Sequence, residues 1–158
     1  WTPLHLAAQY QDADVCKLLI DSGAMVNDKE NDGYTPLHIA ARYKDADVCK
    51  LLINSWALVN DKRNDGCTPL HIAAGYQGAD MCKLLIESGA LVNDKENNGA
   101  TPLHFAAFAG QLSVVKLLVD NKSDLSITNS FGKTALQVAQ QGNHTSVVQY
   151  LKDRISSS

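Results

Sequence analysis

The sequence predicts an all-α solenoid, a stack of helix-turn-helix units that share one continuous core. Three observations support this fold class. The tetrapeptide Thr-Pro-Leu-His begins at Thr2 and returns at Thr35, Thr68 and Thr101, always 33 residues later. The units that start at Thr2 and Thr35 agree at 25 of 33 positions. Each unit carries two short segments with apolar residues at helical spacing, which cannot bury those residues alone and must stack on neighbours.

The residues that begin the two helices of a unit follow the usual capping chemistry. Thr35 is a favourable N-cap, and Pro36 suits the first helical position, where its missing N–H costs nothing. Lys44 and Asp45 are expected to form the turn between the helices, with Asp45 as the cap of the second helix. That second helix is expected to bury a stripe of four residues, Val48, Cys49, Leu52 and Ile53.

The second helix ends where a left-handed residue is expected. Gly23 and Gly89 suit this position, because glycine adopts a positive φ cheaply. Trp56 and Lys122 stand at the same position in the second and fourth units, where a side chain costs about 1–2 kcal/mol. The loops that follow read NDKENDG, NDKRNDG and NDKENNG. Their Asp-Gly and Asn-Gly pairs favour tight turns, so each loop is expected to form a hairpin finger.

A 33-residue period that opens T-P-L-H-x-A-A resembles the ankyrin repeat, and the resemblance covers essentially the whole chain. It implies a single domain of stacked helix-turn-helix units with β-hairpin fingers, and a structural role for the recurring histidines. The last repeat of this chain is more polar than the others, and it is expected to cap the C-terminal end of the stack. The expected boundaries are 2–34, 35–67, 68–100, 101–133 and 134–155, with a frayed tail at 156–158.

Charge and hydropathy exclude several classes of partner. The net charge of −3 and the pI of 5.9 give no electrostatic footprint for nucleic acid or an anionic membrane. No window approaches the roughly 18 consecutive apolar residues of a membrane span. The first residues lack the basic region of a signal peptide, so none is expected. The protein is expected to be a monomer.

The cysteines indicate an intracellular protein, cytoplasmic or in another reducing compartment. Cys16, Cys49 and Cys82 recur every 33 residues, so they lie on successive helices about 8–10 Å apart. A disulfide needs Cα atoms within about 7 Å, so these thiols are expected to be free and buried. Cys67 falls at a finger tip and is expected to be exposed and reactive.

No residue pattern indicates an enzyme, a metal site or a cofactor. Gly132-Lys133-Thr134 looks like the end of a phosphate-binding loop, but Ile127 stands where that motif needs a glycine. No serine or cysteine lies on a strained elbow, and the acids are periodic with lysines beside them. The histidines recur once per unit, too far apart to share a metal. They are His5, His38, His71 and His104.

Ankyrin proteins bind other proteins at a concave face, formed by finger tips and inner helices, so the resemblance implies a partner protein there. Aromatic and arginine side chains dominate interface energetics. The expected partner-binding residues are therefore the aromatic and arginine residues of the concave face. They are Trp1, Tyr10, Tyr34, Arg42, Tyr43, Tyr76 and Phe108. A row of lysines on the second helices is expected to be a solvated convex surface, formed by Lys17, Lys50, Lys83 and Lys116.

Three alternatives stay open at this point. Instead of an independent interaction module, the chain could serve as a structural spacer. It could also be a regulatory segment of a larger enzyme, channel or scaffold, or an engineered repeat protein. The three tyrosines that recur unchanged, Tyr10, Tyr43 and Tyr76, either read a partner or only stack between repeats. An asparagine in each V-N-D turn either stabilises the hairpin or, as in some ankyrin proteins, is a hydroxylation site. These are Asn27, Asn60 and Asn93.

Overall fold

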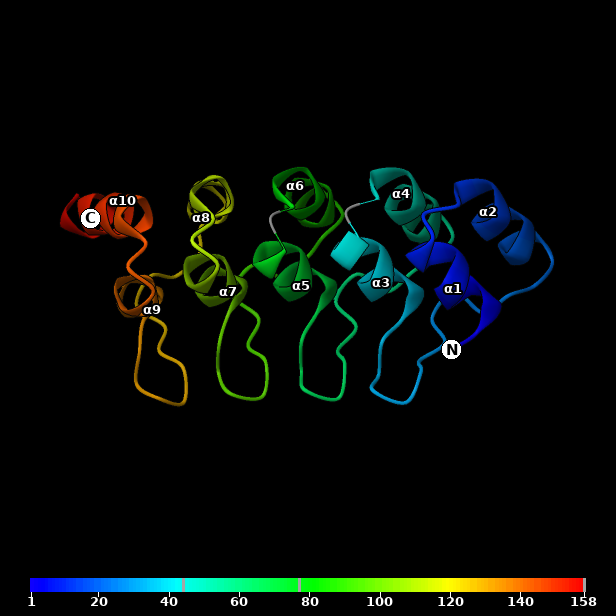
Figure 1. Cartoon of the computed structure of the whole chain (residues 1–158), viewed down its shortest axis with the longest axis horizontal. Helices are drawn as coiled ribbons and strands as arrows, with labels where there is room; N and C mark the ends of the chain where they lie inside the picture. Colours follow the sequence, from blue (N-terminus) through cyan, green and yellow to red (C-terminus); the bar gives the residue numbers. More distant parts are fainter. Residues whose placement is uncertain (44, 77, 158) are drawn as a thin grey trace.

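Two parallel rows of helices run along the chain in a computed structural model that describes residues 1–43, 45–76 and 78–157 (Figure 1). The row next to the fingers, here called the inner row, contains α1 (Pro3–Gln9), α3 (Pro36–Tyr43), α5 (Pro69–Gly75), α7 (Pro102–Phe108) and α9 (Ala135–Gln141). The outer row contains α2 (Ala13–Asp21), α4 (Ala46–Asn54), α6 (Ala79–Glu87), α8 (Leu112–Asp120) and α10 (Thr145–Ser156). The predicted all-helical stack is therefore confirmed for these residues.

The core lies between successive units, as expected for a solenoid. Each inner helix packs on its outer partner and on the inner helix of the next unit. Ala40 and Ala73 are fully buried, and their small side chains let neighbouring inner helices come close. Leu52 and Leu85 fill the space between the two rows, also without solvent exposure. The repeats thus bury together what no single repeat could bury.

The caps follow the sequence closely. Asp45 accepts a hydrogen bond of 2.9 Å from the Val48 N–H, which confirms it as the N-cap of α4. Lys44, the other predicted turn residue, lies outside the described residues. Trp56 and Lys122 have φ values of 71° and 67°, so the predicted left-handed conformation is confirmed at both.

The fingers, residues 27–34, 60–67, 93–100 and 126–133, project from the inner row as irregular loops (Figure 1). Within the described residues they contain no β-strand, so the predicted β-hairpins are not observed. In the first finger, the Glu30 N–H bonds the Tyr34 carbonyl at 3.0 Å and the Gly33 N–H bonds the Glu30 carbonyl at 2.8 Å. These are turn bonds, and they are too few to form a ladder.

The α10 helix extends to Ser156 and Ser157 follows as its C-cap, while Ser158 lies outside the described residues. None of the helices in the part of the chain that the structure describes is long and apolar enough to cross a bilayer.

Candidate functional site

The recurring histidines link each inner helix to the following finger. In the second unit, His38 Nδ1 accepts the Thr35 N–H at 3.2 Å, and Nε2 donates to the Cys67 carbonyl at 3.1 Å. Burial lowers the pKa of His38 to about 4, so the ring is neutral at physiological pH. The same two bonds recur at His5, His71 and His104. The predicted structural role of this histidine ladder is confirmed.

A second ladder ties the outer turns together. Asn60 donates to the Gly89 carbonyl at 3.0 Å and accepts the Leu91 N–H at 3.0 Å. Asn27 and Asn93 bridge to the following unit in the same way. The asparagines therefore stabilise the contact between units.

The surface on which partner binding is predicted, here called the inner face, is formed by the fingers and by the C-terminal ends of the inner helices. Near its centre the Arg42 guanidinium lies over two aromatic rings. Its carbon Cζ is 5.1 Å from the Tyr76 ring centre and 6.0 Å from that of Tyr43. Gln9 donates to the Tyr43 hydroxyl at 3.3 Å. Arg42, Tyr43 and Tyr76 are all exposed, so three consecutive units contribute to one exposed polar and aromatic cluster.

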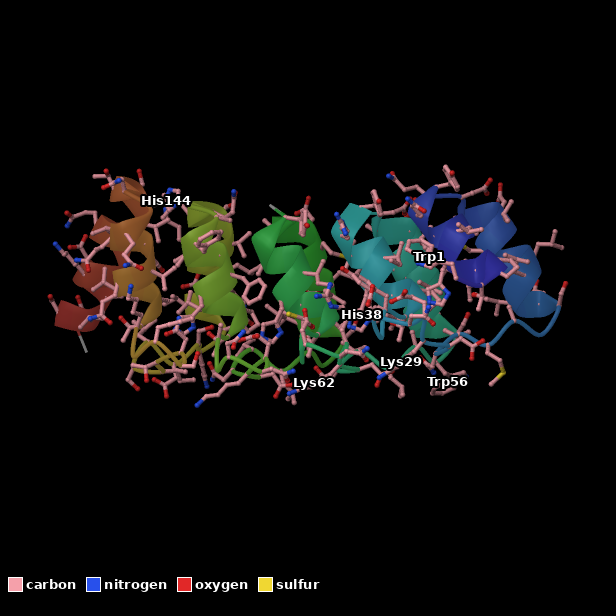
Figure 2. The ribbon with its side chains drawn as sticks, turned by 60° about the horizontal axis from the view of Figure 1, so that its bottom comes forward. Trp1, Lys29, His38, Trp56, Lys62 and His144 are labelled. Atoms are coloured by element: carbon pink, nitrogen blue, oxygen red, sulfur yellow. The ribbon has the colours of Figure 1, made fainter. Side chains whose placement is uncertain are left out.

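Three other predicted residues lie in or next to the first and fourth units. Tyr10 follows α1, at the position that Tyr43 and Tyr76 occupy in the next units, and it is exposed. Trp1 is exposed and lies beside α1, with its ring centre 6.0 Å from that of His5 (Figure 2). Phe108 ends α7 and is 75% exposed. Its carbonyl accepts a 2.8 Å hydrogen bond from Nε2 of His144, which lies at the turn before α10 (Figure 2).

Tyr34 is held differently from the other predicted residues. It is only half-buried, and the Arg63 guanidinium lies 4.3 Å from its ring centre and donates to its hydroxyl. Its own carbonyl accepts the hydrogen bond from His5 Nε2. Arg63 is also bound to Asp65. Tyr34 is therefore engaged by the next finger, and less of its ring is available to a partner.

Cys67 corrects one expectation. Although it ends a finger, it is only 4% exposed. Its carbonyl receives hydrogen bonds from His38 and from the Arg63 N–H. Burial and the nearby Asp65 carboxylate raise the pKa of the Cys67 thiol to about 12. The predicted exposed, reactive thiol is wrong.

Sequence reasoning missed a hollow of about 440 Å³ between the fourth and fifth units. Three phenylalanines contribute to its lining, namely Phe105, Phe108 and Phe131, together with Val138. Phe131 is 77% exposed at a finger position that holds Asp32 in the first unit. Comparing the same position across units would have revealed this replacement. Only Phe108 was among the predicted residues.

Within the described ranges, no group of three or more His, Cys, Asp or Glu side chains is arranged to hold a metal ion. The four cysteines are free thiols, and all are buried. The lysines at positions 17, 50, 83 and 116 lie exposed on the outer helices. Because they lie on the outer row of helices, they provide a control surface separate from the inner face.

Comparison with protein families gives a match over most of the chain. A model of ankyrin repeats in three copies matches residues 1–62 and 51–129. A model of ankyrin repeats in many copies matches residues 109–151. No curated protein gives a significant match to the sequence.

Proposed function

This chain belongs to the ankyrin-repeat family, whose repeats generally bind other proteins, and on that basis we propose that it binds a partner protein through its inner face. The proposed module is non-enzymatic and needs no cofactor. The fingers and inner helices serve as a scaffold, and the exposed aromatic and arginine side chains that they carry contact the partner. The free buried thiols support a role inside the cell, where thiols stay reduced.

The observation that carries this proposal is the cluster of Arg42, Tyr43 and Tyr76. Tyrosine and arginine are over-represented among the residues that dominate binding energy. The side chains are exposed, so the core does not explain their presence. The guanidinium lies over both rings, and we expect these contacts to order the three side chains before a partner binds. Pre-ordering of this kind reduces the entropy lost on association.

The alternatives make different demands on this surface. A structural spacer needs only the contacts between repeats, and its exposed side chains contribute nothing to binding. A regulatory segment of a larger protein also uses the inner face, but its partner is another part of the same chain. An engineered repeat protein would also need exposed side chains on the inner face to bind its target. The test below therefore separates the spacer from the other two.

The test is alanine scanning of both surfaces. Tyr43→Ala and Tyr76→Ala are each expected to weaken partner binding by about 1–3 kcal/mol. Lys50→Ala and Lys83→Ala, on the outer helices, are the matched controls and are expected to be nearly neutral. The partner is captured from cell lysate on the unmodified protein, identified, and its dissociation constant measured for each variant by calorimetry. Urea melts of the same variants exclude unfolding as the cause.

The result that would overturn the proposal is equally specific. If the lysine variants abolish binding and the tyrosine variants do not, the contact lies on the outer helices. If neither set of variants changes the affinity of any captured protein, the inner face is not the binding surface.

A further inference from the structure

The hollow between α7 and α9 differs chemically from the rest of the inner face. Its apolar lining comes from Phe105 and Phe108 on α7, Phe131 on the last finger and Val138 on α9. The hydrogen bond from His144 to the Phe108 carbonyl ties the end of α7 to the fifth unit. The hollow therefore has walls from the fourth and fifth units, which this bond joins directly, and Ala100 at the end of the third finger also lines it. Its volume of about 440 Å³ is within the usual range of ligand pockets.

The finger that borders this hollow has lost negative charge relative to the other fingers. Phe131 stands where the first two fingers carry Asp32 and Asp65. Asn129 stands where the first and third fingers carry Glu30 and Glu96. Both replacements occur in the same finger, residues 126–133. As a result, no acidic side chain is among the residues that line the hollow.

The same finger has gained a positive charge. Lys133 lines the hollow at the position of Tyr34, Cys67 and Ala100 in the earlier fingers. Its backbone is held at both polar atoms, because its N–H bonds the Asn129 side chain and its carbonyl accepts from His104. Its ammonium group makes no ion pair among the described residues. Burial lowers the pKa of His104, which also lines the hollow.

We propose that this hollow takes an apolar side chain of the partner protein, with an aspartate or glutamate next to it in the partner's sequence. The apolar side chain, aromatic or branched aliphatic, packs among the phenylalanines. The neighbouring carboxylate pairs with Lys133. This inference rests on the proposed function, since it names the chemistry that one part of the inner face recognises. The charge of the lining favours an acidic flanking residue, because the lining contains the Lys133 ammonium and no carboxylate.

The test uses three blocked pentapeptides as probes and follows the protein by two-dimensional amide NMR. They are acetyl-Gly-Glu-Phe-Glu-Gly-amide, its Lys-Phe-Lys counterpart and its Glu-Ser-Glu counterpart. The first is expected to shift amides of Phe105, Phe108 and Phe131. The lysine peptide is expected to bind about three- to tenfold more weakly at low salt, as is typical when a partly exposed ion pair is replaced by repulsion. The serine peptide is expected to leave these amides unshifted.

Variants assign the effect to the named residues. Lys133→Glu is expected to reverse the preference between the two charged peptides. Phe131→Asp introduces the residue that the first two fingers carry at this position. It is expected to weaken binding of the acidic peptide at least about tenfold. Lys50→Glu makes the same charge change on an outer helix and is expected to have no effect on the peptides. Phe131 and Lys50 are exposed, so both variants are expected to fold.

Equal binding of the two charged peptides, or an absence of shifts around the hollow, would overturn this inference. Its failure is distinguishable from failure of the proposed function. If the peptides leave the hollow unaffected while Tyr43→Ala and Tyr76→Ala still weaken the captured partner, the inner face binds the partner elsewhere. If the hollow responds as expected but the tyrosines are neutral, the binding surface is confined to the fourth and fifth units.

Discussion

The Nε2 atom of His38 donates a 3.1 Å hydrogen bond to the carbonyl oxygen of Cys67, which lies 29 residues later at the end of the next finger. The other ring nitrogen, Nδ1, accepts the Thr35 N–H at 3.2 Å. Both nitrogens are used, one as donor and one as acceptor, so the neutral ring fits this site. A proton added to Nδ1 would break the bond to Thr35. Figure 2 shows His38 where the helices meet the fingers.

This geometry predicts that acid destabilises the protein in a defined pH window. Burial lowers the pKa of His38 to about 4 in the folded state, while the unfolded chain has the usual value near 6.5. The unfolded chain therefore binds more protons between these values, and stability is lost as the pH falls from about 6.5 towards 4. His38 alone is expected to contribute a loss of roughly 2 kcal/mol between pH 7 and pH 5. Urea unfolding at both pH values measures it.

The fifth unit suggests the control for this experiment. Gln137 occupies the histidine position there, and its side chain accepts the Thr134 N–H at 2.9 Å. His38→Gln is therefore expected to keep the cap and remove the titration. Its free energy of unfolding should fall less between pH 7 and pH 5 than that of the unmodified protein. An identical fall in both proteins would show that His38 does not carry the pH dependence.

All four cysteines are expected to resist a thiol reagent in the folded protein. Burial raises the pKa of Cys16 to about 11 and those of Cys49, Cys67 and Cys82 to about 12. Little thiolate is present at neutral pH, and the thiolate is the reactive form. Titration with an aromatic disulfide reagent should show slow labelling without denaturant and four thiols in urea. Rapid labelling of one cysteine in the folded protein would contradict the observed packing of that residue.

Trp56→Gly is expected to stabilise the protein by roughly 1 kcal/mol, because it relieves the left-handed conformation. Trp56 has a φ of 71°, and its side chain is 86% exposed (Figure 2). Gly23 and Gly89 occupy the same position in the first and third units with φ values of 94° and 97°. Urea midpoints of the variant and the unmodified protein measure the difference.

Two further variants complete that comparison. Lys122→Gly, at the same position in the fourth unit, is expected to stabilise by a similar amount. Lys50→Gly, inside the α4 helix, is expected to destabilise by about 1 kcal/mol, as glycine does in a helix interior. A lower midpoint for Trp56→Gly would show that the tryptophan contributes a stabilising contact that outweighs the strain.

Asn60→Ala is expected to destabilise the protein by about 1–2 kcal/mol, since it removes two hydrogen bonds to the following unit. Those bonds reach the Gly89 carbonyl and the Leu91 N–H. Asn31→Ala is the matched control: Asn31 is exposed at a finger tip, and it bonds the next finger through its backbone carbonyl, which the substitution keeps. Thermal melts of both variants give the comparison. Equal melting temperatures would mean that the asparagine ladder does not stabilise the stack.

Much of this architecture follows from local sequence alone. The 33-residue period places each helix, Thr35 and Asp45 supply caps through bonds within three residues, and the glycine position reveals the left-handed turn at Trp56. These features depend on backbone geometry and near neighbours, so one unit is enough to predict them. The predicted β-hairpins are not observed in the fingers, because each finger forms turn bonds within itself and then bonds the next finger.

Contacts between units were decided only by the tertiary structure. Cys67 ends a finger in the sequence, yet it is only 4% exposed, and its carbonyl accepts a hydrogen bond from His38 on α3. Tyr34 is held by Arg63 from the next finger, 29 residues away. The hollow beside Lys133 is lined by residues of more than one unit. The sequence determined which residues each unit offers, and stacking determined which of them stay accessible, because burial depends on neighbours that are distant along the chain.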